Sequence, residues 1–263
     1  MAMGFPHQEG SVVMTRTLSI ITAVHQAGVA HLRSAYDSLA RQRLPAGWDW
    51  EWLIQEDGDG VAAASEVPAD HRILVAKSRR GGPHVARTVA LGRSSGEFVK
   101  NLDADDVLAE GVLARDIEVL ERNADIGWTT SAVLDLLPDG SLASFPGDPA
   151  AGRIARGAVF AHWEKNKRAQ VHPTTLCARR TLVLALGGWM ALPASGDTGL
   201  LLGLDALASG WFHAEVGLYY RKHPGQITAD ARHSQGDEWE ARMRVIGEHA
   251  RALHKMMASA QSD

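Results

Sequence analysis

The sequence predicts an α/β fold with a mostly parallel central sheet, flanked by helices and followed by a helical extension at the C-terminus. The chain has 263 residues, of which 45% are hydrophobic and 22% charged, enough for one sizeable core. Apolar runs of strand length alternate along it with stretches of helical spacing. Two of the apolar runs end abruptly in acidic residues, as strands do where an α/β sheet binds its ligands.

The N-terminal half of the chain has the alternation that is typical of βαβ units. Continuous apolar runs, without the polar alternation of a half-buried strand, suit parallel strands that are covered on both faces. Apolar residues that recur every three or four positions, closed by Pro or Gly, mark the helices between them. We expect strands at residues 18–24, 50–55, 73–76 and 98–102, and helices at residues 29–43, 84–93 and 112–120.

The C-terminal half is expected to add a hairpin, three helices and two further strands. A turn signal, P-D-G at 138–140, separates hairpin strands at 128–137 and 141–145, and residues 146–157 show no period and are expected to form an irregular loop. We expect the remaining strands at residues 174–178 and 212–220 and the helices at residues 158–167, 180–186 and 198–209.

The chain is expected to divide into a flexible leader at residues 1–16, an α/β domain at residues 17–230 and a C-terminal helix at residues 231–263. The leader is polar and contains glycine and proline. The C-terminal helix carries an apolar stripe that is expected to pack on the domain or on a second subunit, which would make a homodimer. The members of the stripe are Trp239, Met243, Ile246, Ala250, Leu253 and Met257.

Composition argues against several classes of protein. A formal net charge of −4 provides no positive field for nucleic acid or anionic lipid. No run approaches the ~18 apolar residues of a transmembrane helix, and the N-terminal residues lack the charged-then-apolar order of a secretion signal, so we expect neither. The lone cysteine, Cys177, excludes an internal disulfide and suits a reducing compartment, so we expect a cytoplasmic protein in which Cys177 is a core residue. Neither G-x-G-x-x-G nor the P-loop pattern occurs, which argues against a dehydrogenase or a P-loop kinase.

The apolar segment at residues 98–102 runs directly into three carboxylates, Asp103, Asp105 and Asp106. Carboxylates clustered at a strand end repel one another unless a cation lies among them. A divalent ion such as Mg²⁺ or Mn²⁺ removes that repulsion, and such ions commonly bridge the phosphates of a nucleotide. The alternative is a strand end followed by a helix N-terminus, where Asp is a favoured cap, and we expect Asp106 to take that role.

Two further polar turns are expected near this edge of the sheet. Thr22, Ala23 and His25 end the first strand, where nucleotide-binding sheets face their ligand; the alternative for His25 is an ordinary surface position. The loop K-S-R-R-G-G-P at 77–83 follows the third strand and contains three cations and two glycines. Next to an acidic metal site it would neutralise a diphosphate, whereas elsewhere it would simply be solvated.

Several short motifs follow one another along most of the chain. In the N-terminal half they are L-S-I-I-T-A-V-H (18–25), W-L-I-Q-E-D-G (52–58), A-R-T-V-A-L-G-R-S-S-G-E-F (86–98) and the acids of D-A-D (103–105). In the C-terminal half they are G-G-W (187–189), G-D-T-G-L-L-L-G-L (196–204) and Y-Y-R-K-H-P-G (219–225). In this order the motifs resemble the family 2 glycosyltransferases of the GT-A fold. The resemblance implies a Rossmann-like sheet that binds a nucleoside diphosphate sugar together with a divalent metal ion.

The resemblance also implies roles for individual residues. Asp103 would reach the ribose, Asp105 would hold the metal on the diphosphate, and Asp197 would act as the general base. His223 matches a histidine that several relatives place near the metal or the diphosphate. The residues that the resemblance and the turn positions assign to the nucleotide sugar are Thr22, Ala23, His25, Asp57, Arg79, Arg87, Asp103 and Ala104.

The chain departs from the family pattern at three positions. Asp59 stands where the family usually has Ser, and Thr88 stands where it has Asn. Gly196 replaces the first member of an acidic pair, so only Asp197 remains to carry the role of the base. The alternative for Asp197 is an N-cap of the helix that follows it.

The activity that the resemblance implies is an inverting, metal-dependent transfer of a sugar, from UDP rather than GDP, to a hydroxyl or amine of a small molecule or glycan. His172 and Trp189, the latter in a loop that suggests an exposed aromatic, are the candidates for acceptor contact. Two alternatives stay open: a sugar-nucleotide nucleotidyltransferase and a non-catalytic nucleotide- or carbohydrate-binding module. Nucleotidyltransferases usually have a Gly-rich signature with Arg and Lys after the first strand, which residues 25–28 do not provide.

Overall fold

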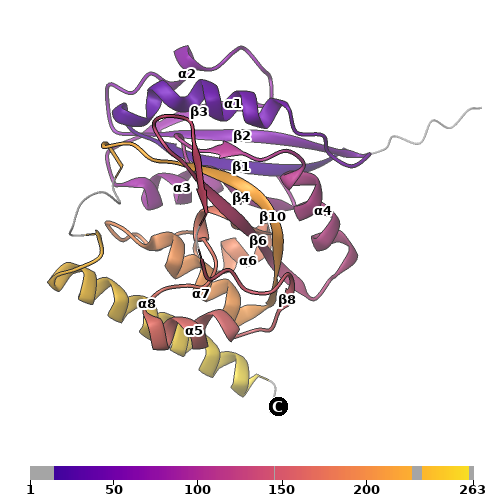
Figure 1. Cartoon of the computed structure of the whole chain (residues 1–263), viewed down its shortest axis with the longest axis vertical. Coiled ribbons are helices and arrows are strands. Elements are labelled where there is room, and N and C mark those ends of the chain that lie inside the picture. Colours follow the sequence, from indigo (N-terminus) through magenta and orange to yellow (C-terminus); the bar gives the residue numbers. More distant parts are fainter. Residues whose placement is uncertain (1–14, 145, 227–232, 261–263) are drawn as a thin grey trace, which may run out of the picture.

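One twisted, mixed sheet forms the centre of the molecule (Figure 1). The structure is a computed structural model that describes residues 15–144, 146–226 and 233–260. The strand order is β3-β2-β1-β4-β9-β6-β10-β5, with β7 added to β6 and β8 added to β10. The strands are β1 (Arg16–Val24), β2 (Trp48–Asp57), β3 (Ile73–Ser78), β4 (Phe98–Asn101), β5 (Val107–Leu108), β6 (Ile126–Leu136), β7 (Leu142–Ser144), β8 (Gly152–Ile154), β9 (Cys177–Arg179) and β10 (Ser209–Arg221).

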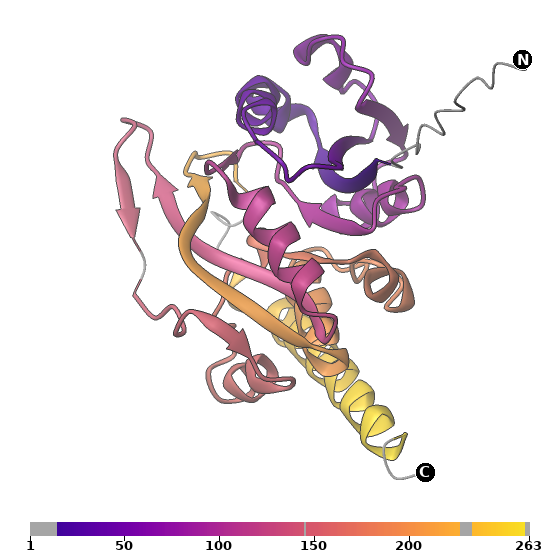
Figure 2. The same ribbon diagram turned by 90° about the vertical axis from the view of Figure 1, so that its right-hand side faces the viewer.

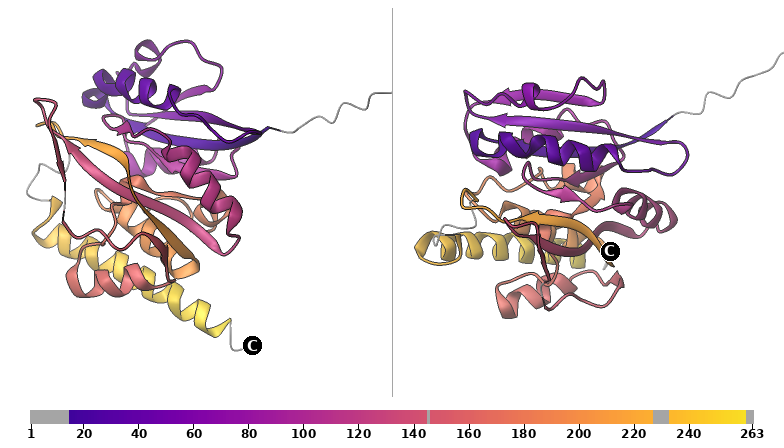
Figure 3. Two further views of the ribbon diagram at one scale, coloured as in Figure 1. Left: turned by 45° about the vertical axis from the view of Figure 1, so that its right-hand side comes forward. Right: turned by 45° about the horizontal axis from the view of Figure 1, so that its top comes forward.

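Helices cover both faces of the sheet. They are α1 (Leu32–Ala40), α2 (Ala63–Glu66), α3 (Pro83–Leu91), α4 (Val112–Arg122), α5 (Ala158–Asn166), α6 (Arg180–Ala185), α7 (Gly196–Leu207) and α8 (Asp237–Ser259), with 3-10 helices η1 (Gln26–His31) and η2 (Pro173–Thr175). Apolar side chains of α1 and α4 form the core on one face, and those of α3, α5, α6, α7 and α8 form it on the other. In Figure 3 the N-terminal strands lie at one end of the molecule and α5, α7 and α8 at the other.

The first four strands of the fold are parallel, so their carboxyl ends lie at one edge of the sheet. In the register of β1 with β2, Val24 is paired with Glu56, and in that of β1 with β4, Ile21 is paired with Asn101. The acidic stretch after β4 therefore begins beside the end of β1, and the acids that end β2 lie one strand further away. This is the edge at which α/β sheets bind ligands.

The second half of the sheet brings a distant segment to the same edge. β9 runs antiparallel to both β4 and β6, and β6 is parallel to β10. β10 consequently runs in the same direction as β4, and its carboxyl end at Arg221 lies near the acidic stretch. Figure 2 shows β6 and β10 as long curved strands that lie side by side.

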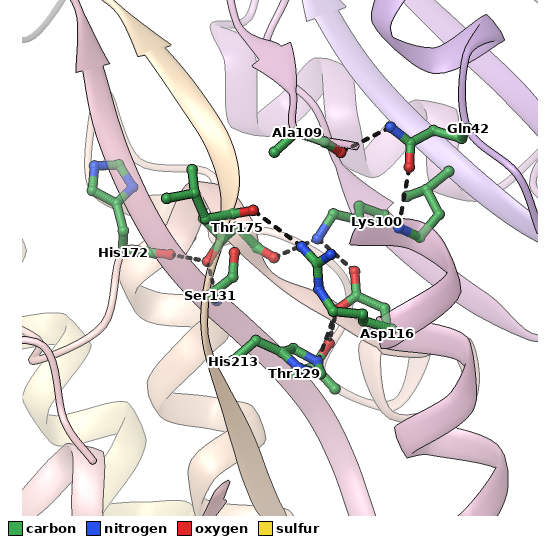
Figure 4. A network of polar contacts seen from close by, with 12 residues as sticks. Gln42, Lys100, Ala109, Asp116, Thr129, Ser131, His172, Thr175 and His213 are labelled. Atoms are coloured by element: carbon green, nitrogen blue, oxygen red, sulfur yellow. Dashed lines mark hydrogen bonds and ion pairs between the residues drawn. The ribbon is translucent and has the colours of Figure 1, made fainter. Parts of the chain in front are cut away.

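A buried polar network crosses the middle of the sheet (Figure 4). Lys100 of β4 donates from Nζ to Asp116 Oδ2 of α4 and to the carbonyl oxygen of Thr175, both at 2.7 Å. The second oxygen of Asp116 accepts from the Thr129 hydroxyl at 2.6 Å. The Thr175 hydroxyl accepts from the Ser131 amide and donates to the carbonyl oxygen of His172. The network therefore joins the core to the turn that contains His172.

The predicted α/β fold with a mostly parallel sheet is confirmed, and the expected helices and strands are present with shifted ends. Three expectations were wrong in detail. Residues 146–157 include a short strand, β8, which pairs with β10, although their composition has no strand signal. The first α-helix begins at Leu32 because residues 26–31 form η1, and the strand expected at 174–178 begins only at Cys177 after η2.

The start of the chain differs from expectation, whereas its C-terminal helix packs as one of the two expected alternatives. Arg16, assigned to the leader, is the first residue of β1 and forms ion pairs with Glu97 and Glu121. The rest of the assigned leader, up to residue 14, lies outside the described residues, as does the expected domain boundary at 230. The stripe of α8 packs on the domain, where Met243 and Ile246 are buried in the core next to α7. In the part of the chain that the structure describes, no helix is long and apolar enough to cross a bilayer.

We expect Lys100→Met to lower the free energy of unfolding by about 3–5 kcal/mol, because it leaves the Asp116 carboxylate buried without its cation. Denaturant unfolding followed by circular dichroism measures the change. Lys165→Met, at an exposed position of α5, is the control and should change it by less than about 0.5 kcal/mol. The double variant Lys100→Met/Asp116→Asn should recover part of the loss. Equal stability of the Lys100→Met variant and the control would contradict the assignment.

Candidate active site

The carboxyl ends of β1, β4 and β10 and the first turns of α3 surround a small cleft of about 130 Å³. Three acidic or basic side chains from these elements, Arg87, Asp103 and Asp105, lie in its wall together with His223. The predicted residues Ala23, His25 and Ala104 line it as well. The remaining lining residues are Val24, Gly28, Pro83, Tyr220, Gly225 and Gln226.

Arg87 and Asp103 form a partly buried ion pair in the wall of the cleft. The Arg87 side chain is 7% exposed, and its Nη2 donates to Asp103 Oδ1. Asn101 donates to the same carboxylate oxygen at 3.2 Å. The pair joins α3 to the end of β4 and keeps a positive charge beside the acidic stretch, where an anionic ligand would require it.

Asp105 and His223 form a second pair in the wall of the cleft. His223 Nε2 lies 2.8 Å from Asp105 Oδ2. The Nε of Arg221 donates to the Asp105 carbonyl oxygen at 2.7 Å, which fixes the loop after β10 against the acidic stretch. One carboxylate and one imidazole suit a divalent cation whose other ligands are phosphate and water oxygens. Within the described residues no group of three or more His, Cys, Asp or Glu side chains could hold an ion alone.

Asp106, expected to cap a helix, has a different position. The helix that follows, α4, begins at Val112 with Gly111 as its N-cap, so the expected role was wrong. Asp106 is fully buried, and its Oδ1 accepts from the Arg221 amide at 3.0 Å. Burial and the nearby carboxylates of Asp103 and Asp105 raise the pKa of Asp106 well above its ordinary value. Asp106 therefore attaches β10 to the acidic stretch and does not face the cleft.

Asp197 lies in the first turn of α7, one residue after Gly196, and the N-cap position belongs to Ser195. Its Oδ1 accepts from the Thr198 amide at 2.8 Å. Burial acts to raise the pKa of Asp197, but His84 in its protonated form, the charge of Arg87 and the Thr198 amide lower it overall. The helix dipole favours the same ionised form. Asp197 is therefore a carboxylate near neutral pH, as a proton acceptor must be.

His84 fixes the start of α7 from the first turn of α3. Its Nε2 accepts from the Gly196 amide at 3.1 Å, and its Nδ1 lies 3.1 Å from Arg87 Nη1. Burial and the charge of Arg87 lower the pKa of His84 to about 4. The imidazole is therefore neutral near pH 7, and Arg87 is the cation that acts on Asp197.

The absence of an acidic side chain at Gly196 has a steric cause. A Cβ at this position would lie 2.4 Å from the Met190 carbonyl oxygen and 2.6 Å from the His84 ring. The residue before it, Ser195, has a left-handed backbone with φ of 63°. Arg242 of α8 donates to the Ser195 hydroxyl at 2.7 Å, so the C-terminal helix holds this junction in place.

Three residues predicted to contact the nucleotide do not line the cleft. Thr22 is fully buried, and its hydroxyl donates to the Leu102 carbonyl oxygen and accepts from Trp52 Nε1. Asp57 accepts from the amides of residues 81 and 82 and so fixes the loop before α3. Arg79 is exposed in that loop and lines neither this cleft nor the larger cavity beside it.

The larger cavity, of about 680 Å³, has Ser195 and Thr198 in its wall, on either side of Asp197 in the sequence, but Asp197 itself lines neither this cavity nor the cleft. Tyr220 lines both the cavity and the cleft, so the two spaces share a wall. His172 lines the cavity, as expected of an acceptor candidate. Trp189 does not: its side chain is buried, so the expectation of an exposed aromatic was wrong.

Thr88 and Trp189 support each other instead of facing a ligand. The Thr88 hydroxyl donates to the Trp189 carbonyl oxygen at 3.1 Å and accepts from its amide at 3.0 Å. The sequence reasoning missed Tyr220, His84 and Arg242 as members of the site. Tyr220 stands in the quoted Y-Y-R-K-H-P-G motif and could have been identified there, whereas only the packing of α3 and α8 on α7 reveals the other two.

Comparison with known proteins gives a family match over part of the chain and a shared fold. Residues 19–133 match the model of glycosyl transferase family 2, which confirms the predicted resemblance over these residues. An uncharacterized glycosyltransferase of Methanocaldococcus jannaschii is 24% identical over 131 residues, which are 48% of this chain and 44% of the length of that relative. The chain thus spans less than half of the curated relative that it matches.

Solved structures of S. aureus TarS share the fold. The chain superimposes on TarS residues 1–349 in complex with UDP-GlcNAc with a TM-score of 0.66 and 15% identity, over 90% of this chain and 70% of that one. For TarS residues 1–349 in complex with UDP the TM-score is 0.58 with 14% identity, over 79% and 61% of the two chains. The predicted GT-A fold is confirmed by this likeness.

We expect Gly196→Ala to lower the free energy of unfolding by about 1–3 kcal/mol, because the methyl group has no room between Met190 and His84. Gly203→Ala in the same helix is the control, since its methyl group would meet the flexible end of the Leu186 side chain at 3.0 Å and the His249 ring at an ordinary contact distance of 3.6 Å, and no backbone atom. Chemical denaturation of both variants measures the difference. A Gly196→Ala variant as stable as the Gly203→Ala variant would show that the start of α7 is not tightly held.

Proposed function

From the match to glycosyl transferase family 2 and the geometry of the cleft, we propose that this chain transfers a sugar from a nucleoside diphosphate sugar to an acceptor. The observation that carries the proposal is the position of Arg87. Its buried guanidinium is bonded to Asp103 after β4, and its charge acts on Asp197 at the start of α7. His84 lies 3.1 Å from Arg87 Nη1 and accepts from the Gly196 amide, so the same cation is also joined to the start of α7, at the carboxyl edge of the sheet where nucleotides bind.

The donor is proposed to occupy the cleft between the ends of β1 and β10. His25 and Ala23 would face the base, and Asp103 would accept a hydrogen bond from the ribose. Arg87 would lie near the diphosphate, although its bond to Asp103 means that the charge is shared between carboxylate and phosphate. We propose UDP as the nucleotide because S. aureus TarS, whose fold is similar, has been solved with UDP and with UDP-GlcNAc.

Asp197 is proposed to remove the proton from the acceptor. The acceptor oxygen or nitrogen forms a bond to the anomeric carbon as the bond from that carbon to the diphosphate oxygen breaks, and the proton passes to Asp197. A single displacement inverts the configuration of the sugar, since no covalent intermediate with the protein is formed. The lowered pKa of Asp197 keeps it ionised at neutral pH, and its place in the first turn of a helix holds it rigidly.

Asp105 and His223 are proposed to hold a Mn²⁺ or Mg²⁺ ion. The 2.8 Å between Oδ2 and Nε2 shows that both side chains reach the same point, and the remaining ligands would be diphosphate and water oxygens. Such an ion, when bound, stabilises the negative charge that develops on the leaving diphosphate. Arg87, in the wall of the same cleft, would assist.

We also propose that the reaction takes place in the cytoplasm and that the acceptor is a small molecule or a glycan. The single cysteine, Cys177, is buried and unpaired, as expected in a reducing compartment. The cavity beside Asp197 is large enough for a sugar-sized molecule.

We expect Asp197→Asn to reduce hydrolysis of a UDP sugar about 10²–10⁴-fold, because the amide cannot accept the proton. Its affinity for UDP should stay within about twofold, since Asp197 does not line the donor cleft. Asp37→Asn on α1, a half-buried residue that pairs with Arg33 and lines neither the cleft nor the cavity, serves as control and should behave as the unchanged protein. Product analysis and calorimetric titration measure the two quantities. Normal turnover by the Asp197→Asn variant would exclude Asp197 as the base. If the unchanged protein bound UDP but neither hydrolysed nor transferred the sugar, a binding module would be favoured.

We expect Mn²⁺ to strengthen UDP binding at least about tenfold, equivalent to about 1.4 kcal/mol, and Asp105→Asn to abolish this gain. The reason is that Asp105 is the carboxylate that we assign to the ion. Calorimetric titrations of UDP with Mn²⁺ and with EDTA, on the unchanged protein and on an Asp139→Asn control in an exposed turn, provide the comparison. An Asp105→Asn variant that retains the full Mn²⁺ effect would refute the assignment.

A further inference from the structure

The cavity beside Asp197 has a basic wall. Among the described residues that line it, three are permanently charged cations and one is an acid, Asp148. The cations are Lys167, Arg168 and Lys222. Lys222 is partly neutralised, since its Nζ lies 3.3 Å from Asp135 Oδ1. The net charge of the wall is therefore positive, in contrast to the negative charge of the whole chain.

Two of the cations, Lys167 and Arg168, occupy the turn at the end of α5. Both are exposed at the rim, and the described residues give neither of them a carboxylate within ion-pair distance. Lys167 Nζ lies 4.7 Å from the centre of the Trp163 ring, which keeps the ammonium on the cavity side of the helix.

Backbone strain is concentrated in the same wall. Of the described residues other than glycine, only Lys167 and Ser195 have positive φ, at 52° and 63°. A left-handed backbone is unfavourable for a residue other than glycine, so glycine would be the more stable choice at the end of α5. Lysine at this position is explained if its side chain has a function in the cavity.

The rest of the wall suits a ring-shaped, polar molecule. Tyr220 and Trp239 contribute aromatic surface. His172 packs against Tyr220, with ring centres 5.1 Å apart, and its turn is fixed to the core through the Thr175 hydroxyl. This side of the cavity is therefore preformed, which favours binding without reorganisation.

We propose that this cavity selects an acceptor that carries an anionic group, phosphate or carboxylate, and that Lys167 and Arg168 bind that group. The inference rests on the proposed function, because it places the hydroxyl of such an acceptor near Asp197. The acceptor oxygen then bonds to the anomeric carbon, its proton passes to Asp197, and the nucleoside diphosphate leaves. The anionic group is not consumed and serves only for recognition.

Calorimetric titrations with three probes test the proposal: glucose 6-phosphate, glucuronate and glucose, each with the protein saturated with UDP. At least one of the two anionic probes should bind at least about ten times more tightly than glucose. The probe that does so identifies the anionic group as phosphate or carboxylate. The variant Lys167→Gln/Arg168→Gln should lose this preference. The matched control, Lys165→Gln/Lys255→Gln, removes two exposed cations that do not line the cavity and should retain it.

Several outcomes would overturn the inference. One is equal binding of all three probes, and another is a preference for the anionic probes that survives Lys167→Gln/Arg168→Gln. A third is a preference for the anionic probes that UDP abolishes by competition, since the anion would then occupy the donor cleft. Failure of the proposed function is distinguishable: UDP would not bind, while the same titrations without UDP would still report whether the cavity prefers anions. If the cavity then still preferred anions through Lys167 and Arg168, the anion site would stand and only the proposed sugar transfer would be withdrawn.

Discussion

The ion pair between the buried Arg87 guanidinium and Asp103 is the interaction on which the site depends. A cation that is almost fully removed from water requires a carboxylate partner, and Arg87 is bonded to Asp103. The charge of Arg87 also lowers the pKa of Asp197. The position of the cation is itself determined by Asp57, whose carboxylate fixes the loop at the start of α3. Acids after β2, after β4 and at the start of α7 are thus linked through one helix.

The start of α7 is held by three separate segments, which explains how a helix end can present a carboxylate in a defined place. His84 accepts from the Gly196 amide, and Arg242 donates to the Ser195 hydroxyl. The close approach of Met190 leaves room only for glycine at 196. The C-terminal helix α8 therefore contributes to the site through Arg242 in addition to burying its apolar stripe.

The fold and the acidic positions could be predicted because their signals are local. Apolar runs, helical spacing and strand ends that carry Asp103 and Asp105 are all visible within ten residues of sequence. The direction of a side chain is not: Thr22 stands at the right strand end but points into the core, where Trp52 and the Leu102 carbonyl oxygen bind its hydroxyl. β8 and the cavity wall depend on pairing with segments that are far apart in the chain, and no local pattern encodes them.

The central claim is that the acidic stretch after β4 and the start of α7 belong to one site that holds a nucleoside diphosphate. A crystal soaked with UDP and Mn²⁺, with data collected at the manganese absorption edge, tests this most directly. The account predicts one anomalous peak within coordination distance of Asp105, with the diphosphate between that peak and Arg87 and the distal phosphate directed towards Asp197. Manganese away from Asp105, or a nucleotide bound outside the cleft between β1 and β10, would contradict it.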